Sequence, residues 1–286
     1  MSKAVVRSAL AAMLLMAAGS LAFAKDAVPY ATIPLKQYIG TFSTFEATVD
    51  GKTGTFLFDT GGGITVVSPD FLKAIGCKVW GRVSGFRMTG ERLDGAHCDG
   101  KQLTAGGKTF DAPVLMEFDI MKLLSSSLPH VDGSAGMDIF AGKVISIVPQ
   151  TAIVVESPES LKARIGHTPA FPIRIVRDAE GVALAANAAV KTPDGTAWME
   201  LDTSNSGAFV ISNHIAPLVD LKADDKDGAP AKIELANGIV LEGKARTRDL
   251  IMDGNIGAGV LSHYVLTLDL AGARAWLTPL PAKPAN

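Results

Sequence analysis

The stretch FLFDTGGG, residues 56–63, places one acid at the end of an apolar strand and directly before three glycines. Large apolar residues immediately before Asp59 are typical of a buried strand. A carboxylate at the tip of such a strand must be paired or have a chemical role, because an isolated buried charge is costly. Glycines after the acid allow other backbone segments to come close to it. The stretch therefore predicts a functional aspartate on a strand-to-loop turn.

A second stretch with the same order, WMELDTS, occupies residues 198–204. Gly51, in an Asp-Gly hairpin turn, lies eight residues before Asp59. Gly195, in a Pro-Asp-Gly turn, lies seven residues before Asp202. The motif and its distance from the preceding turn both recur, which indicates an internal duplication of the chain.

The elements after each acid agree as well. A β-branched strand and a short capped helix are expected over residues 64–75 and again over residues 207–219. Residues 157–172 contain three prolines and little periodicity, which is typical of a boundary between two units. We therefore predict two β-rich lobes, over residues 25–157 and residues 158–286.

Two further segments of the first lobe carry a structural expectation. Residues 78–95 are polar and interrupted by glycines, with large apolar side chains between them, which is typical of a projecting hairpin. Such a hairpin can fold over a cleft as a flap, with Trp80 and Phe86 as candidate contacts, although packing within the hairpin is the favoured role of both side chains. A helix is expected over residues 119–128.

The first 24 residues have the parts of an export signal. Lys3 and Arg7 precede an apolar run over residues 9–18, and Ala22-Phe23-Ala24 forms a cleavage site. The run is short for a bilayer span, and no later stretch has 18 uncharged apolar residues. We expect cleavage after Ala24 and a soluble periplasmic or secreted protein, with an uncleaved membrane anchor as the alternative.

The chain has two cysteines, Cys77 and Cys98. In an oxidising compartment they can close one disulfide loop, and two buried thiols are the alternative. The segment His97-Cys98-Asp99 has no second ligand pair at metal spacing, so no metal site is predicted. A net charge of −2 without a basic stripe argues against nucleic acid and anionic membranes as partners.

Two lobes that each present one aspartate can pack about a pseudo-two-fold axis so that the acids meet. Carboxylates about 3 Å apart do not both ionise cheaply, so the pair shares one proton. A water between them can lose a proton as it attacks an amide carbonyl, while the protonated acid donates to the developing oxyanion. This chemistry needs no metal, no cofactor and no covalent intermediate. The threonine after each acid can hydrogen-bond across the interface, and glycine lets backbone N–H groups reach the carboxylate.

The chain resembles the aspartic peptidases in Asp59-Thr60-Gly61, in Asp202-Thr203, and in the pairs Ala135-Gly136 and Ile256-Gly257 late in each lobe. The resemblance covers nearly all of the mature chain and is closest to bacterial retropepsin-like proteins with two fused lobes. It implies an all-β, bilobal fold of closed acid-protease β-barrels, related by a pseudo-two-fold axis and with few short helices. It also implies a catalytic dyad of Asp59 and Asp202, supported by Thr60, Gly61, Thr203 and Ser204, with a peptide or protein substrate in the cleft between the lobes. Fused lobes need not dimerise to build the dyad, which favours a monomer.

The chain departs from the family pattern at three residues in or beside the two motifs. Ser204 stands where the second motif usually has glycine, and Gly62 and Asn205 stand where a hydroxyl residue is common. The sequence therefore predicts an exported aspartic endopeptidase, with a catalytically weak or inactive relative that binds extended peptides or a cell-envelope partner as the alternative. Ser68 and Ser212 do not lie in a G-x-S-x-G motif and are expected as helix caps, which argues against a serine hydrolase.

Overall fold

The computed structural model describes residues 27–125 and 127–280, and the predicted export signal lies outside these residues. The strands of the described chain form two sheets. The first sheet has eight strands, in the spatial order β2 (Lys36–Gln37), β3 (Ser43–Val49), β4 (Lys52–Phe58), β9 (Gly133–Ala135), β5 (Val66–Val67), β8 (Lys108–Glu117), β7 (Arg92–Ala105) and β6 (Trp80–Phe86).

The first sheet closes on itself, because β3 also pairs with β7. Six strands thus form the barrel of the first lobe. The turn between β3 and β4 is the predicted Asp50-Gly51 hairpin, and both residues have positive φ angles (46° and 77°), as this type of turn requires. Along β3, Phe45, Ala47 and Val49 point into the barrel while alternate residues are more exposed, so the period-2 pattern decides which face is buried.

The second sheet has twelve strands. They lie in the spatial order β1 (Ala31–Pro34), β11 (Ala152–Val155), β10 (Val144–Val148), β19 (Tyr264–Asp269), β20 (Arg274–Pro279), β12 (Phe171–Val176), β13 (Ala185–Thr192), β14 (Gly195–Asp202), β18 (Gly254–Gly257), β15 (Phe209–Ser212), β17 (Val240–Arg248) and β16 (Ala229–Glu234).

The last six strands of this order repeat the barrel of the first lobe. The pairing of β14 with β18 is parallel, as is that of β4 with β9. The pairing of β15 with β17 is parallel, as is that of β5 with β8. A bridge between Val190 and Leu235 brings the two ends of the second barrel together. The predicted duplication is therefore present as a repeated strand topology, and the all-β bilobal fold is confirmed.

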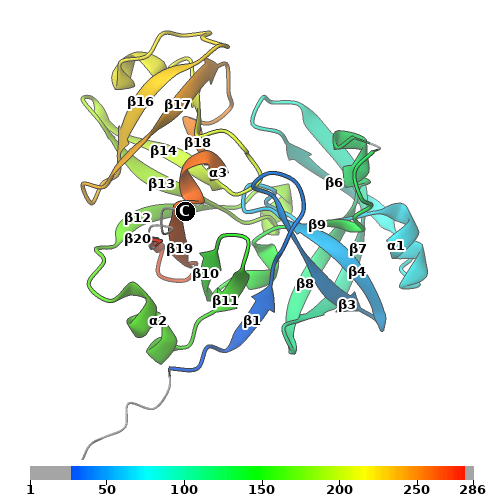
Figure 1. Ribbon diagram of the computed structural model, residues 1–286. Coiled ribbons are helices and arrows are strands. Elements are labelled where there is room, and N and C mark those ends of the chain that lie inside the picture. The colour runs from blue at the N-terminus through cyan, green and yellow to red at the C-terminus, as the bar shows by residue number, and fades with distance from the viewer. Residues whose placement is uncertain (1–26, 126, 281–286) are drawn as a thin grey trace, which may run out of the picture.

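The other six strands of the twelve-stranded sheet join the two halves of the chain. β10, from the first half, pairs with β19 from the second, and the hydroxyls of Ser146 and Thr267 meet across this pair at 2.8 Å. Figure 1 shows this sheet beneath the second barrel, with the first barrel beside it. The hydrophobic core runs through both lobes and the joining sheet.

Helices are few and short. They are α1 (Pro69–Ala74), α2 (Pro158–Ile165) and α3 (Ala258–Leu261), with 3-10 turns η1 (Ile120–Leu123), η2 (Asp138–Phe140), η3 (Ala179–Gly181) and η4 (Ala216–Val219). None of the helices in the described ranges is long and apolar enough to cross a membrane.

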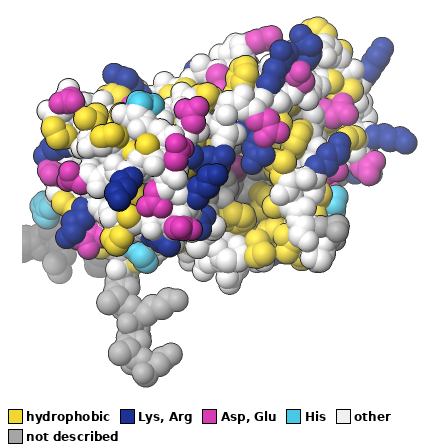
Figure 2. All heavy atoms as spheres, turned by 90° about the horizontal axis from the view of Figure 1, so that it is seen from above, with side chains coloured by type: hydrophobic (Ala, Val, Ile, Leu, Met, Phe, Trp, Pro, Cys, Tyr) yellow, Lys and Arg dark blue, Asp and Glu magenta, His cyan; other side chains and the backbone are white. Residues whose placement is uncertain are grey.

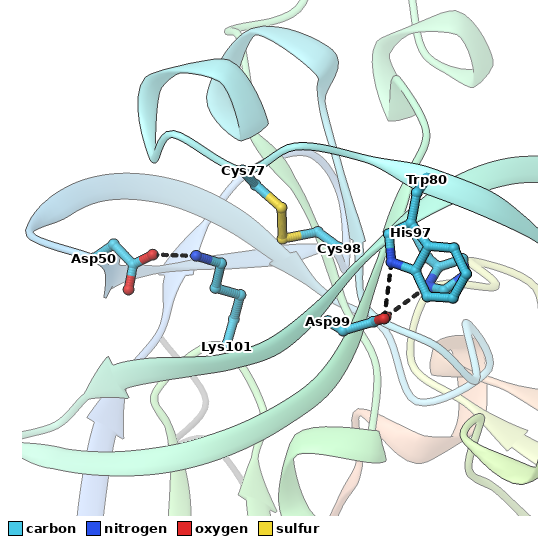
Figure 3. Close-up of a disulfide and its surroundings, with 7 residues drawn as sticks. All are labelled: Asp50, Cys77, Trp80, His97, Cys98, Asp99 and Lys101. Atoms are coloured by element: carbon cyan, nitrogen blue, oxygen red, sulfur yellow. Dashed lines mark hydrogen bonds and ion pairs between the residues drawn. A yellow bond between two sulfur atoms is a disulfide. The ribbon is translucent and has the colours of Figure 1, made fainter.

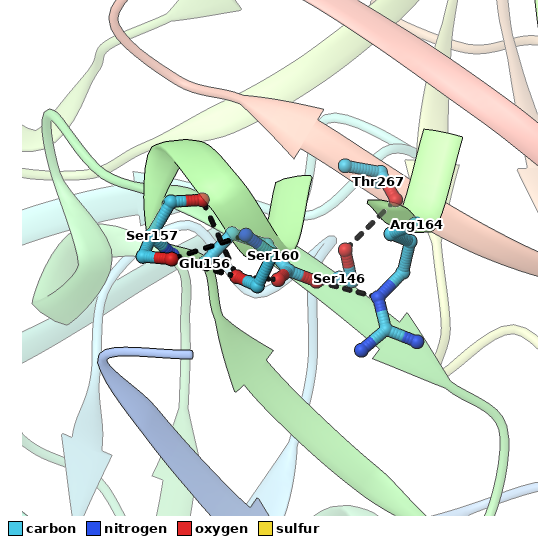
Figure 4. A network of polar contacts seen from close by, with 6 residues as sticks. All are labelled: Ser146, Glu156, Ser157, Ser160, Arg164 and Thr267. Carbon is cyan, nitrogen blue, oxygen red and sulfur yellow. Dashed lines mark hydrogen bonds and ion pairs between the residues drawn. The ribbon is translucent and has the colours of Figure 1, made fainter. Parts of the chain in front are cut away.

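α2 lies in the segment over residues 157–172 that the sequence indicated as the boundary between the two units. Its signals are local: Ser157 caps the helix, Pro158 occupies the first turn, and Ser160 completes a capping box. The buried carboxylate of Glu156 accepts hydrogen bonds from Ser160 and from Arg164 Nε, the latter at 2.6 Å (Figure 4). These contacts hold the helix against the end of the joining sheet.

The predicted helix over residues 119–128 is wrong. Only the 3-10 turn η1 forms, capped by the Asp119 carboxylate on the N–H of Met121. Further along, Ser125 accepts a hydrogen bond from the N–H of Ser127. Such local side-chain bonds compete with the helical pattern, and they end the turn early.

Candidate active site

Equivalent strands deliver the two motif acids to one place. Asp59 follows β4, and its N–H donates to the carbonyl of Ala135 on β9 at 3.0 Å. Asp202 ends β14, beside Gly257 of β18. Both acids line a single cleft between the lobes, where Asp202 is buried and Asp59 keeps some exposure.

The threonines of the two motifs hold the loops together across the interface. Thr60 Oγ1 accepts a hydrogen bond from the N–H of Thr203 at 3.0 Å and donates to the carbonyl of Leu201 at 2.7 Å. In return, Thr203 Oγ1 accepts from the N–H of Thr60 at 3.2 Å. These reciprocal bonds fix the spacing of the two acid-bearing loops, as expected for threonines that point inward.

Backbone donors aim at the facing oxygen of each acid. The N–H of Gly61 donates to Asp59 Oδ1 at 2.9 Å, and the N–H of Ser204 donates to Asp202 Oδ1 at 2.8 Å. The N–H of Asn205 adds a third bond, at 3.1 Å, to the same Asp202 oxygen. The bonds from Gly61 and Ser204 are equivalent in the two lobes. Hydrogen bonds donated to the carboxylates favour their charged form.

Ser204 breaks the symmetry in an informative way. Its Oγ lies 2.7 Å from Asp59 Oδ1 and 2.8 Å from Asp202 Oδ1, so one hydroxyl joins the two acids. A serine hydroxyl has a single hydrogen to donate, so the other short contact is best satisfied by a protonated carboxyl that donates to Ser204. The geometry therefore fits a pair of acids that holds one proton.

Electrostatics favours the same protonation state. Desolvation, followed by the charge of Asp202, raises the pKa of Asp59 to about 7, against the opposing hydrogen bonds from Ser204, Gly61 and Gly62. Because the two carboxyls interact directly, this titration belongs to the pair. The dyad therefore keeps a proton in weakly acidic solution.

Two residues beside the dyad, Asn255 and Glu200, were not foreseen from the sequence. Asn255 Nδ2 donates to the outer oxygen of Asp202, Oδ2, at 2.8 Å and to Glu200 Oε2 at 3.1 Å. Asn205 Nδ2 in turn donates to Asn255 Oδ1 at 2.7 Å. Glu200 is two residues before Asp202 and so shares its face of the strand, a signal that period-2 counting along β14 contains. Asn205, noted as a departure from the family, is part of this support.

The cleft around the dyad holds a volume of about 820 Å³. Figure 2 shows a hollow near the middle of the face seen from above, with hydrophobic side chains beside it. The β6–β7 hairpin covers one side, and at its tip the carbonyl of Met88 accepts a hydrogen bond from the N–H of Ile251 in the other lobe, at 3.0 Å. The hairpin that the sequence suggests as a flap thus lines one side of the cleft and contacts the second lobe.

The two candidate flap residues have different positions. Phe86 lines the cleft. Trp80 lies at the base of the hairpin and is 60% exposed. Its ring packs on that of His97, and its indole N–H donates to the Asp99 carboxylate at 2.9 Å (Figure 3). Trp80 does not line the cleft, because it begins β6 at the base of the hairpin, whereas the part of the hairpin that lines the cleft begins at Gly85.

Cys77 and Cys98 are joined in a disulfide. Cys77 follows α1 and Cys98 lies on β7, so the bond ties the end of the helix to the long strand that carries the flap (Figure 3). The bond anchors the base of the flap hairpin and lies away from the cleft wall.

The interlobe threonines yield a stability prediction. Thr60→Val keeps the shape of the side chain but leaves the N–H of Thr203 and the carbonyl of Leu201 without partners in a buried site. We expect the free energy of unfolding, measured by urea denaturation, to fall by about 3 kcal/mol. Thr60→Ser should recover most of this loss, and Thr104→Val, at an exposed threonine pair, should change little. Equal effects of the valine changes at residues 60 and 104 would contradict the interlobe role.

The fold and the site together define a bilobal, aspartic-peptidase-like protein. Residues 45–139, in the first lobe, match the aspartyl protease family. The basic 7S globulin from soybean has a similar structure, with a TM-score of 0.56 and 11% sequence identity over 87% of this chain and 94% of that chain. Conglutin gamma, a basic 7S globulin from lupine seeds, has a TM-score of 0.56 and 11% identity over 88% and 96%. No curated protein sequence matches the chain.

The two kinds of match carry different information. The family match covers residues 45–139, a segment of the first lobe that contains Asp59 and not Asp202, and it supports an aspartic-peptidase-like first lobe. The solved structures, at 11% identity, show the fold of both lobes and leave the activity open, since both are described as globulins.

Proposed function

We propose that this protein is an exported aspartic endopeptidase, which hydrolyses peptide bonds with a water activated between Asp59 and Asp202. The observation that carries the proposal is that Asp59 and Asp202 meet in one cleft between the lobes, where burial and the charge of Asp202 raise the pKa of Asp59, as in a dyad with one shared proton. The ionised acid takes a proton from water as the water attacks the amide carbon, and the protonated acid donates to the carbonyl oxygen. Proton transfer to the amide nitrogen then releases the amine.

Export is part of this proposal. It rests on the N-terminal segment of the sequence, with its basic residues, apolar run and Ala22-Phe23-Ala24 site, and on the pairing of Cys77 with Cys98, which suits an oxidising compartment. The substrate is an extended peptide or unfolded protein, because the cleft runs between the lobes under a hairpin that can cover a chain.

The test is proteolysis of an unfolded protein by the exported chain, whose first residue should be Lys25, over pH 3 to 9. Because burial raises the pKa of Asp59 to about 7, the dyad keeps its proton below this pH and loses it above. We therefore expect cleavage in weakly acidic solution and a fall in kcat/KM as the pH rises through about 7. Absence of fragments at every pH, or a rate that still increases above pH 8, contradicts the proposal.

The same shift affects stability with a definite sign. Between the ordinary carboxyl pKa of about 4 and the raised value, the folded chain holds a proton at Asp59 that the unfolded chain has released. This acid therefore lowers the free energy of unfolding as the pH rises through that window. Loss of cleavage above pH 7 must be measured alongside folding, so that the two effects are separated.

A second candidate function is a protein that keeps the cleft and binds peptides without cleaving them. It is favoured by Ser204, which stands opposite Gly61 and places a hydroxyl between the acids. Under this alternative the chain would bind unfolded peptides, and Asp59→Asn would leave that binding unchanged.

A further inference from the structure

The cleft is chemically different on the two sides of the dyad. Leu57, two residues before Asp59, and Glu200, two residues before Asp202, occupy equivalent places on β4 and β14. Leu57 is paired with Ser134, and Glu200 is paired with Asn255, in the same parallel register. Both side chains line the cleft. One side of the dyad thus presents an apolar side chain where the other presents a carboxyl.

Glu200 is buried and incompletely satisfied. It is 6% exposed, and its Oε2 accepts one hydrogen bond, from Asn255. Within residues 27–125 and 127–280, its Oε1 has no hydrogen-bond partner in the protein and the carboxyl is in no ion pair, but this oxygen is not fully buried and faces the open cleft. A carboxyl that is desolvated on its protein side gains from any further partner that reaches its open oxygen. Because Glu200 lines the cleft, the group that completes it can come from a ligand.

The charges around Glu200 indicate the sign of that group. Burial, followed by the charges of Asp202, Asp59 and Asp178, raises the pKa of Glu200 well above its usual range. The charged groups that act on this carboxyl are thus all acids. A cation entering here would lower the energy of the ionised carboxyl and would also be attracted to the net negative dyad. An apolar side chain would leave Oε1 without a partner.

We infer that Glu200 determines specificity in a subsite beside Asp202, where it binds a lysine or arginine side chain of the substrate. This inference rests on the proposed peptidase function. The cationic side chain belongs to one of the two substrate residues that flank the cleaved bond, because Glu200 is only two residues from Asp202 on the same face of the strand. Leu57 makes the equivalent place in the first lobe suitable for an apolar side chain.

A purely structural role for Glu200 is the competing explanation, and it predicts a different result. If Glu200 only supported Asp202 through Asn255, its replacement would lower kcat for all substrates by the same factor. A specificity role changes the ratio of kcat/KM values between substrates. The two explanations therefore separate on a ratio, which does not depend on the overall activity of the variant.

The experiment uses two peptides that differ only in lysine or norleucine at a residue flanking the cleaved bond. Each is cleaved by the full mature chain, by Glu200→Gln and by Glu200→Leu, with Glu234→Gln at an exposed glutamate as the matched control. We expect the native chain and the control to prefer lysine by about tenfold or more, because a desolvated charge pair is lost with norleucine. Glu200→Gln should remove this preference, and Glu200→Leu should reverse it. An unchanged ratio in the Glu200 variants overturns the inference.

Binding separates failure of this inference from failure of the peptidase proposal. Fluorescence anisotropy of the same two peptides is measured with Asp59→Asn, with and without Glu200→Gln. Suppose that the native chain cleaves neither peptide, yet the lysine peptide binds about tenfold more tightly than the norleucine peptide, and only when Glu200 is present. In that case the peptidase proposal fails and the subsite stands. Equal binding of the two peptides, or binding of neither, overturns the subsite. Thermal unfolding of every variant shows that the fold is intact.

Discussion

Asp59→Asn should lower kcat for peptide cleavage by about 10³-fold, and Asp202→Asn should do the same. Asparagine has nearly the shape of aspartate, but it can neither take a proton from water nor hold one for the substrate. The dyad needs one acid in each role, and Ser204 already joins their facing oxygens. Removing either carboxyl therefore leaves one of the two proton transfers without its group, and the reaction needs both. The double variant should be little slower than either single variant, because the two acids act as a unit.

The measurement is the initial rate of cleavage of a fluorogenic peptide near pH 5. Asp111→Asn is the matched control, since Asp111 is an exposed aspartate on β8 and away from the cleft. The Asp59→Asn variant should remain folded, because it replaces an acid whose pKa desolvation raises to about 7 and so removes an unfavourable charge. Folded dyad variants that cleave as fast as the Asp111→Asn control would exclude a catalytic dyad.

Much of the fold follows from repeated local signals. The Asp-Gly turn before Asp59, the apolar strand and the second Asp-Thr motif together require two similar β-rich halves that bring Asp59 and Asp202 into one interface. The inward threonines followed from the same symmetry, and the structure joins Thr60 and Thr203 by reciprocal bonds. These inferences succeed because a strand, a tight turn and a motif are each encoded by a few neighbouring residues.

Other features depend on contacts between distant residues. The pairing of β10 with β19 joins segments more than 100 residues apart, and neither strand carries a sign of its partner. The helix predicted over residues 119–128 does not form, because serine side chains there compete with the helical hydrogen bonds. Glu200 does not stand out in the sequence, because the Asp-Thr motif alone marks this strand as functional, although a charged residue inside a buried strand is itself unusual and points to the cleft.

The position of the Ser204 hydroxyl cannot be predicted from the spacing of the motifs along the chain. The sequence indicated only that a side chain replaces the usual glycine. Its position between Asp59 Oδ1 and Asp202 Oδ1 depends on how the two loops meet, which the cross-lobe threonine bonds decide. A departure from the family pattern thus becomes a contact that both acids share.

Gly61→Ala should lower kcat by about 10²-fold while leaving the fold in place. A methyl group at residue 61 would lie 2.6 Å from Cγ of Asp202 and 2.8 and 2.9 Å from its two oxygens, which is too close for any of them. The carboxylate has little freedom to yield, because the N–H groups of Ser204 and Asn205 and the amide of Asn255 hold it from other sides. The variant must therefore move Asp202 or the loop, and a displacement of about 1 Å in a catalytic group costs on the order of 10²-fold in rate.

Gly85→Ala on β6 is the matched control, since residue 85 also lines the cleft but a methyl group there meets no heavy atom within 4 Å. Thermal unfolding and the KM of a short peptide should change far less in Gly61→Ala than kcat does, because the cleft walls are untouched and only the relation of the two acids is altered. A Gly61→Ala variant as active as the Gly85→Ala control would mean that Asp202 is not held against Gly61 during catalysis. At Gly61 the backbone of one lobe lies directly against the catalytic acid of the other lobe. The loss of rate in Gly61→Ala therefore measures how much displacement of Asp202 relative to Asp59 the reaction tolerates.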